Sequence, residues 1–249
     1  MQCQYCKEEK KLCKAHIIPE SFIRFMYPSG KVEGLSLVML AEKKEYPSYP
    51  RVGLYDETIL CAECDGEIGR KYDEYGKKIF LDAEPRKIKG IDSGDALVFE
   101  GADSDKAKLF LLSVLWRFSI SNLPELTMKL PQKFENSLLE MIKNNKAGDL
   151  DDFSTVITLF SYQESQKELR KYFQTPGKTR MNGINYWDLY LPNGYKILIK
   201  VDSRKQLEEL APLSMATNKP VYVVRYEDFV KTHEFKKLLQ NKHKIKKWE

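Results

Sequence analysis

Hydrophobic positions recur at helical spacing in the middle of the chain. In the segment "SDKAKLFLLSVLWRFSISN", Leu109, Leu112 and Leu115 fall on one face of a helix, and Ser104 is the expected N-cap. A second helix is expected from about Pro131 to Asn144. The central part of the chain is therefore predicted to be helical.

The following part of the chain changes to the period of β-strands. The segments "STVITLFSY", "INYWDLYL", "YKILIKV" and "PVYVVRY" alternate or run continuously apolar, which is typical of strands. Pro192, Asn193 and Gly194 separate the middle two and predict a hairpin. We expect an antiparallel sheet, closed by a short basic helix or tail at "HEFKKLLQNKHKIKKWE".

The first third of the chain contains few long periodic segments. Residues 26–55 are rich in Gly, Pro, Tyr and Lys and are expected to form loops and short strands. We therefore predict an α+β protein with two units. The first spans 1–83, and the second, at 84–249, is a helical segment plus the antiparallel sheet.

Composition supports a folded domain and limits its location. The chain has 249 residues, of which 42% are hydrophobic and 12% aromatic, enough to bury a core. No apolar run approaches the roughly 18 residues of a membrane span, and the charged N-terminus does not resemble a secretory signal. We expect a cytoplasmic protein. The net charge of +5 permits a nucleic-acid partner without requiring one.

Four of the five cysteines form two C-x2-C pairs. Cys3 and Cys6 stand near the N-terminus, and Cys61 and Cys64 follow a long insertion. This doubled spacing predicts one structural Zn2+ ion held by four thiolates, the alternative being that one pair is simply buried. The remaining Cys13 is expected to be a small, half-buried hydrophobe.

His16 lies between the two pairs, in "AHIIPESF". It is one of three histidines, and a histidine here can be a metal ligand, a packed core residue or a base. The ligand interpretation is the weakest because four thiolates already satisfy a zinc ion. The spacing alone leaves the core and base interpretations open.

The order of these motifs resembles a known family. C-x2-C, then "HIIP", then C-x2-C followed at once by an acidic residue resembles the zinc-containing HNH, or ββα-metal, endonucleases, some of which are linked with mobile elements and phage defence. The resemblance covers about the first third of the chain and implies a treble-clef nuclease unit. It implies that His16 is the general base, that Asp65 holds a catalytic Mg2+ or Mn2+, and that the cysteines bind the structural zinc.

One position departs from the family. An Asp or His usually precedes the base and binds the catalytic ion, but this chain has Ala15. A hydrated Mg2+ can be held by one carboxylate plus substrate phosphate oxygens, so the site is weakened rather than lost. Glu67 and Asp73 are further candidate carboxylates, although we expect Asp73 and Glu74 to form a solvated helix face.

Basic residues predict where substrate DNA would bind. Those of the first unit are Arg24, Arg51, Arg70, Lys71, Lys77 and Lys78. Arg24, Arg70 and Lys71 are the predicted phosphate contacts, with Arg70 and Lys71 nearest the proposed metal helix, whereas Lys77 and Lys78 are expected to be solubilising charge. The lysine-rich end of the chain fits a DNA-contacting tail and a solvated end equally well.

The second unit gives fewer functional signals. Trp116 is expected in the core, and Arg117 either pairs with a carboxylate or reaches phosphate. Tyr186, Trp187 and Tyr190 are expected to pack across strands rather than stack on bases. This region is predicted to select substrate or bind a protein partner. Two functions remain: an HNH-type DNA endonuclease, and a zinc-stabilised nucleic-acid-binding module without turnover.

Overall fold

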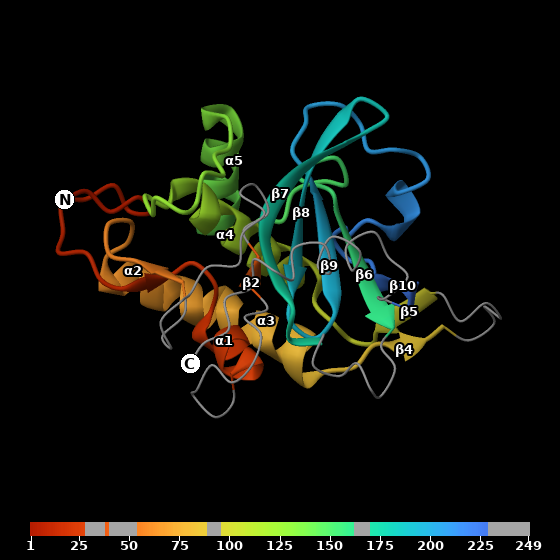
Figure 1. The fold of residues 1–249 in the computed structure, drawn as a ribbon. Helices are drawn as coiled ribbons and strands as arrows, with labels where there is room; N and C mark the ends of the chain where they lie inside the picture. Colours follow the sequence, from red (N-terminus) through yellow and green to blue (C-terminus); the bar gives the residue numbers. More distant parts are fainter. Residues whose placement is uncertain (28–37, 40–53, 89–95, 162–169, 229–249) are drawn as a thin grey trace.

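The computed structural model describes residues 1–27, 38–39, 54–88, 96–161 and 170–228. Within them the fold is α+β, and the helices gather on one side of a large sheet (Figure 1). The predicted terminal helix, its lysines, His233 and His243, and also Arg51, lie outside the described residues. No described helix combines the length and the apolar character that a membrane crossing requires.

The sheet has eight strands in the order β2-β7-β8-β9-β6-β10-β5-β4. In chain order they are β2 (Val38–Met39), β4 (Arg86–Lys87), β5 (Ala96–Phe99), β6 (Thr155–Ser161), β7 (Phe173–Met181), β8 (Ile184–Leu191), β9 (Tyr195–Lys200) and β10 (Val221–Asp228). The sheet is mixed, because β6 pairs in parallel with β10 and β2 pairs in parallel with β7. The expectation of a purely antiparallel sheet is therefore wrong.

The predicted hairpin joins β8 to β9 and also anchors the sheet to the helices. Asn193 and Gly194 have φ values of 74° and 89°, a left-handed turn that Asn and Gly tolerate best. The Asn193 side chain donates from Nδ2 to the carbonyl of Phe80 at 2.9 Å. The tip of the hairpin is thereby fixed to the end of a helix in the first third of the chain.

That helical segment is continuous from residue 62 to residue 82 but not regular. It consists of α2 (Ala62–Ile68), a π-helical stretch (Gly69–Asp73), α3 (Glu74–Lys77) and a second π-helical stretch (Lys78–Asp82). One side of the segment faces the core, with Ile68, Tyr72 and Ile79 buried and Tyr75 partly buried. π-helical turns are rare and occur frequently at functional sites.

A helix that is buried along nearly its whole length, α4 (Ser104–Ile120), forms the centre of the molecule. It packs against the long helical segment, α5 (Gln132–Lys143) and β7. The ring of Phe110 lies between Phe22 of α1 (Glu20–Met26) and Phe80, with centroid distances of 5.6 and 5.7 Å. Both expected helices are confirmed, but the N-cap of α4 is Asp103 rather than Ser104, since the Asp103 side chain accepts the Lys106 amide hydrogen bond at 3.0 Å.

One buried hydrophobic cluster extends through both parts of the chain. It includes Cys3 and Ile17 near the N-terminus, Trp116 on α4, and Ile197 in the sheet. Tyr186, Trp187 and Tyr190 are also buried, in agreement with the expected packing role. The candidate site described below is therefore attached to a rigid core.

Candidate functional site

The four cysteines of the two C-x2-C pairs meet in space. The sulfur atoms of Cys3, Cys6, Cys61 and Cys64 all lie within 4.8 Å of one another, and three of these residues are buried. In a tetrahedral zinc site with Zn–S bonds of about 2.3 Å, the sulfurs would be about 3.8 Å apart. The donor set and its spacing fit one metal ion after a small contraction.

The electrostatics of this cluster also favour a cation. Burial raises the pKa of the Cys64 thiol. Burial also raises that of Cys3, but backbone hydrogen bonds from Cys6, Cys61 and Tyr5 outweigh it and lower the Cys3 pKa to about 7. Four neighbouring thiolates repel one another, so full ionisation requires a positive charge between them.

His16 lies on a two-stranded sheet that contacts α2 (Ala62–Ile68), the helix that carries Cys64. β1 (Ala15–His16) pairs antiparallel with β3 (Tyr55–Asp56), and His16 is opposite Tyr55. The two rings meet edge to face with centroids 6.5 Å apart, and the imidazole is half-buried. Ala15 is fully buried and contributes no ligand atom. His16 is therefore neither enclosed in the core nor fully solvated.

Asp65 stands on the first turn of α2, directly after Cys64. Burial raises the pKa of its carboxyl group, and the nearby Asp73 raises this pKa further. Arg117 and His16 act in the opposite direction and lower the pKa. Among the described residues, no side chain or amide donates a hydrogen bond to this carboxylate. His16 and Asp65, both predicted as site residues, thus lie within electrostatic range of each other, and the described residues leave the Asp65 carboxylate oxygens without a hydrogen-bond donor.

Asp73 joins this group, contrary to the expectation that it lies on a solvated helix face. Its side chain is 17% exposed and forms an ion pair with Arg117, which is 1% exposed. Burial raises the pKa of Asp73, while the guanidinium of Arg117 and the nearby imidazole of His16 oppose the rise. Glu74, in contrast, is exposed as expected.

The π-helical stretch explains why Asp73 faces the site. In a regular α-helix, residues eight positions apart are rotated by about 80° around the axis. The π turn closes hydrogen bonds from i to i+5 and takes up an extra residue, which reduces the rotation between Asp65 and Asp73. Sequence periodicity assumes a regular helix, so it makes Asp73 a candidate carboxylate but leaves it about 80° around the axis from Asp65.

Arg117 is the residue that sequence reasoning left undecided. It comes from α4, far from the cysteine motifs, and no local pattern links it to His16. The available signal was a single arginine within a nearly continuous apolar run, because a buried guanidinium needs a partner. The structure provides that partner in Asp73.

The other candidate side chains lie on the surface around this group. Glu67 accepts hydrogen bonds from Tyr5 at 3.1 Å and from Lys71 at 2.5 Å, so its carboxylate is already engaged. Arg24 forms an ion pair with Glu20 at 2.8 Å. Arg70 is exposed, and its guanidinium lies beside Gly66 on the same helix. These three cations remain accessible to a polyanion, since exposed ion pairs are weak.

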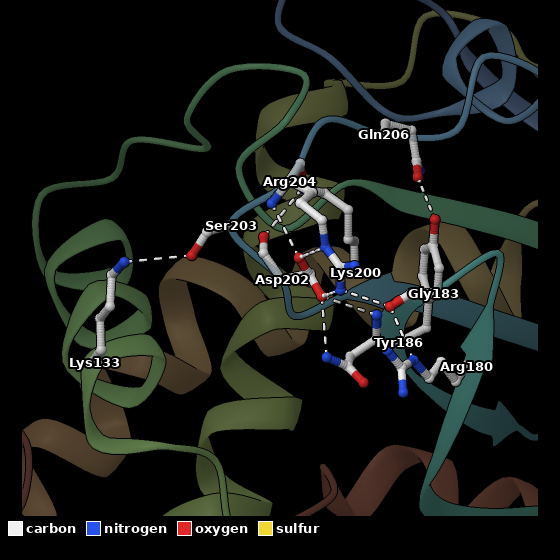
Figure 2. Close-up of polar contacts among 10 residues, drawn as sticks. Lys133, Arg180, Gly183, Tyr186, Lys200, Asp202, Ser203, Arg204 and Gln206 are labelled. Carbon is white, nitrogen blue, oxygen red and sulfur yellow. Dashed lines mark hydrogen bonds and ion pairs between the residues drawn. The ribbon is translucent and has the colours of Figure 1, made fainter.

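Two surface pockets lie elsewhere. One of about 700 Å³ is at the start of α4, and one of about 570 Å³ is between α5 and the segment after β9. Figure 2 shows the polar network beside the second: Lys200 donates to the carbonyl of Asp202 at 3.1 Å, and Asp202 pairs with Arg204 at 2.5 Å. These groups satisfy one another, so the network is a structural anchor for this segment.

Comparison with known proteins adds no assignment. No family model, no curated protein and no solved structure matches this chain.

Proposed function

We propose that this protein is a metal-dependent HNH-type endonuclease that hydrolyses phosphodiester bonds in DNA, in phage defence or within a mobile element. The observation that carries the proposal is the placement of His16 and Asp65 within electrostatic range of each other, beside the four-cysteine cluster. An antiparallel strand pair followed by a helix is the arrangement expected for a ββα-metal, treble-clef unit. In this proposal the four cysteines hold a structural Zn2+.

The chemistry assigned to His16 is that of a general base. Its unprotonated ring nitrogen takes a proton from a water molecule, whose oxygen then forms a bond to phosphorus. The bond from phosphorus to the 3′-oxygen breaks, and the leaving oxygen finally receives a proton from solvent. A positioned base of this kind typically contributes about 10²–10⁴-fold to the rate.

Asp65 is the proposed ligand of the catalytic Mg2+ or Mn2+. Its carboxylate is half-buried, and none of the described residues donates a hydrogen bond to either of its oxygens. When bound, the divalent ion stabilises negative charge on the phosphate and the leaving oxygen. Mg2+ keeps several waters and needs only one or two protein carboxylates, so Ala15 at the neighbouring position is tolerated.

A plasmid-nicking assay tests the proposal. Wild type is expected to nick supercoiled plasmid with Mg2+ or Mn2+, and His16→Ala and Asp65→Asn are expected to lose about 10²-fold or more. Glu74→Gln, at an exposed carboxylate of the same helical segment as Asp65, is the matched control and should cut like wild type. Equal cutting by His16→Ala and wild type would refute the assignment of the base.

The second candidate is a zinc-stabilised nucleic-acid-binding module without turnover. The observation that favours it is Ala15, buried at the position where the family carries a metal ligand. This alternative expects DNA binding with no nicking in any divalent metal. The same assay, combined with a gel-shift measurement on the same plasmid, separates the two functions.

A further inference from the structure

The guanidinium of Arg117 connects three elements of the candidate site. Its Nη2 donates to Oδ1 of Asp73 at 2.7 Å, and its Nη1 donates to Oδ2 of Asp73 at 3.0 Å. Nη1 also donates to the main-chain carbonyl of His16 at 3.0 Å. One side chain on α4 therefore holds both the strand that carries His16 and the helix that carries Asp65 and Asp73.

The remaining donors of this group are also satisfied. Nε of Arg117 donates to the carbonyl of Ser113 at 3.3 Å, and Nη2 lies 3.5 Å from its hydroxyl oxygen. Ser113 is one turn earlier on α4 and is fully buried. The guanidinium is consequently fixed in orientation, and only its planar fork can make the two parallel bonds to Asp73.

Stability alone is a poor explanation for such a pair. A buried ion pair can often be replaced by apolar residues of similar volume without loss of stability. Arg117 could instead be an apolar residue like its neighbours Trp116 and Phe118, both of which are buried. The pair is better explained by what it holds in place, namely the main chain of His16 and the carboxylate of Asp73.

We propose that Arg117 and Asp73 are positioning residues for His16. Arg117 fixes the main chain at His16, and Asp73 supplies negative charge that favours the imidazolium after His16 has taken a proton from water. The inference rests on the proposed nuclease function, but it concerns the placement and charge of His16, which can be measured without any cutting.

The first measurement is an NMR titration of the His16 imidazole in the full-length protein as purified. The chain has three histidines, so His16→Ala assigns the signal directly. The charges that act together here are Asp65 on α2, Asp73 on the π-helical stretch and Arg117 on α4. Asp65 is unchanged in all variants, so differences between their His16 titrations report on Arg117 and Asp73.

The two single variants are expected to shift the His16 titration in opposite directions. Asp73→Asn removes a negative charge and leaves Arg117 unbalanced, so the pKa of His16 should fall by roughly one unit. Arg117→Met leaves the negative charge of Asp73 unbalanced, so the pKa should rise. A general loosening of the fold would move both variants the same way.

Lys108→Met is the matched control. Lys108 is the other buried cation on α4, but its ammonium donates to the carbonyl of Asp149 and not to the site. This variant should leave the His16 titration unchanged. Arg117→Lys retains the positive charge but cannot make the two parallel hydrogen bonds to Asp73. It replaces Arg117→Met in the titration if Arg117→Met does not fold.

The second measurement is the kinetics of plasmid nicking. Arg117→Lys and Asp73→Asn are expected to lower kcat by about 10²-fold, the typical effect of a catalytic group displaced by about 1 Å, with KM within about twofold. The His16 titration of Arg117→Lys should remain close to wild type, which separates the loss of geometry from the loss of charge.

The possible failures are distinguishable. Unshifted His16 titrations, or shifts of the same sign in Asp73→Asn and Arg117→Met, would overturn the positioning roles even if wild type cuts DNA. If wild type cuts nothing, the proposed function fails. The NMR titration would then still support or refute the placement of His16 by this pair.

Discussion

The carboxylate of Asp56 accepts a hydrogen bond from the hydroxyl of Ser121 at 2.9 Å, which joins the strand opposite His16 to the end of α4. The same carboxylate accepts bonds from the main-chain N–H of Asn122 at 2.7 Å and of Thr58 at 2.8 Å. The β1–β3 pair, only two residues per strand, therefore gains its rigidity from α4. Both Asp56 and Arg117 attach the His16 strand to this helix.

Asp56→Asn is expected to destabilise the protein at neutral pH. An amide offers one acceptor oxygen where the carboxylate offers two, and buried donors left without a partner cost about 1–3 kcal/mol. Burial alone would raise the pKa of Asp56, but hydrogen bonds from Thr58, Asn122 and Ser121 outweigh it and lower the pKa. Urea unfolding at pH 7 measures the loss.

The sign of the pH dependence follows from that lowered pKa. Stability from Asp56 is fully present above the unfolded-state pKa of about 3.9 and is lost as pH falls through the lower folded-state value. The stability difference between wild type and Asp56→Asn should therefore shrink below about pH 4. Glu57→Gln, at an exposed neighbouring carboxylate, is the control and should change stability by less than about 0.5 kcal/mol. An undiminished difference at pH 3 would contradict this account.

Two glycines of the long helical segment are expected to respond oppositely to alanine. A Cβ at Gly76 would lie 2.4 Å from the Phe110 ring, whereas a Cβ at Gly69 would meet nothing within 4 Å. Alanine favours a helix by up to about 1 kcal/mol, but overpacking a core costs about 1–3 kcal/mol. Gly76→Ala should therefore lower the Tm, and Gly69→Ala should leave it equal or higher. A stabilised Gly76→Ala would mean that α3 and α4 are not so closely packed.

Local sequence signals were sufficient for much of the fold but not for its sheet. The two long helices and the β8–β9 hairpin depend on short-range periodicity and turn residues, and all three are present. β7 was missed because "TPG" interrupts it, and the structure accommodates these residues at a register shift between Gln174 and Gly177. The parallel β6–β10 pairing depends on a return across the sheet that no local pattern specifies.

The candidate site shows the same division. The resemblance to the HNH family implies that His16 and Asp65 act together, although the spacing of the motifs alone leaves the role of His16 open. Asp73 and Arg117 could not be placed, because one depends on a π-helical turn and the other on the packing of a distant helix. Tertiary packing determines both, and periodicity within one element carries no information about it.

Because of Lys108, the free energy of unfolding is expected to change with pH in the alkaline range. Burial lowers the pKa of this lysine to about 8, compared with 10.5 for an unperturbed lysine. Between these values the unfolded chain binds more protons than the folded one, so stability rises with pH, by on the order of 3 kcal/mol in total. Lys108→Met has no ammonium group to bury in its charged form, so it does not carry this cost to stability. Its stability advantage over wild type should be largest below about pH 8 and decline toward pH 10.5 in urea titrations.

Metal removal tests the cysteine cluster independently of catalysis. We expect elemental analysis to find close to one zinc ion per chain, lost in Cys64→Ser and retained in Cys13→Ser, because Cys13 lies outside the four-cysteine cluster. A structural zinc site contributes folding free energy, so a strong chelator should lower the Tm of wild type and of Cys13→Ser. Zinc retained in full by Cys64→Ser would exclude the four-thiolate site.

The salt dependence of DNA binding tests the basic surface around the site. Each phosphate contact releases counterions, so removing one should reduce the slope of log K against log salt by about 0.9 on duplex DNA. Arg70→Ala and Lys71→Ala should each flatten the slope by this amount, and Arg24→Ala should do the same if α1 also contacts the backbone. Lys78→Ala is the control, because Lys78 is an exposed lysine of the same helical segment expected to serve only solubility.

The measurement is fluorescence anisotropy between 50 and 200 mM salt, without divalent ions so that no cleavage occurs. Equal slopes for wild type and Arg70→Ala would place the DNA on a different face of the molecule, whereas a flattened slope for Lys78→Ala would extend the contact along the helix toward its second π-helical stretch.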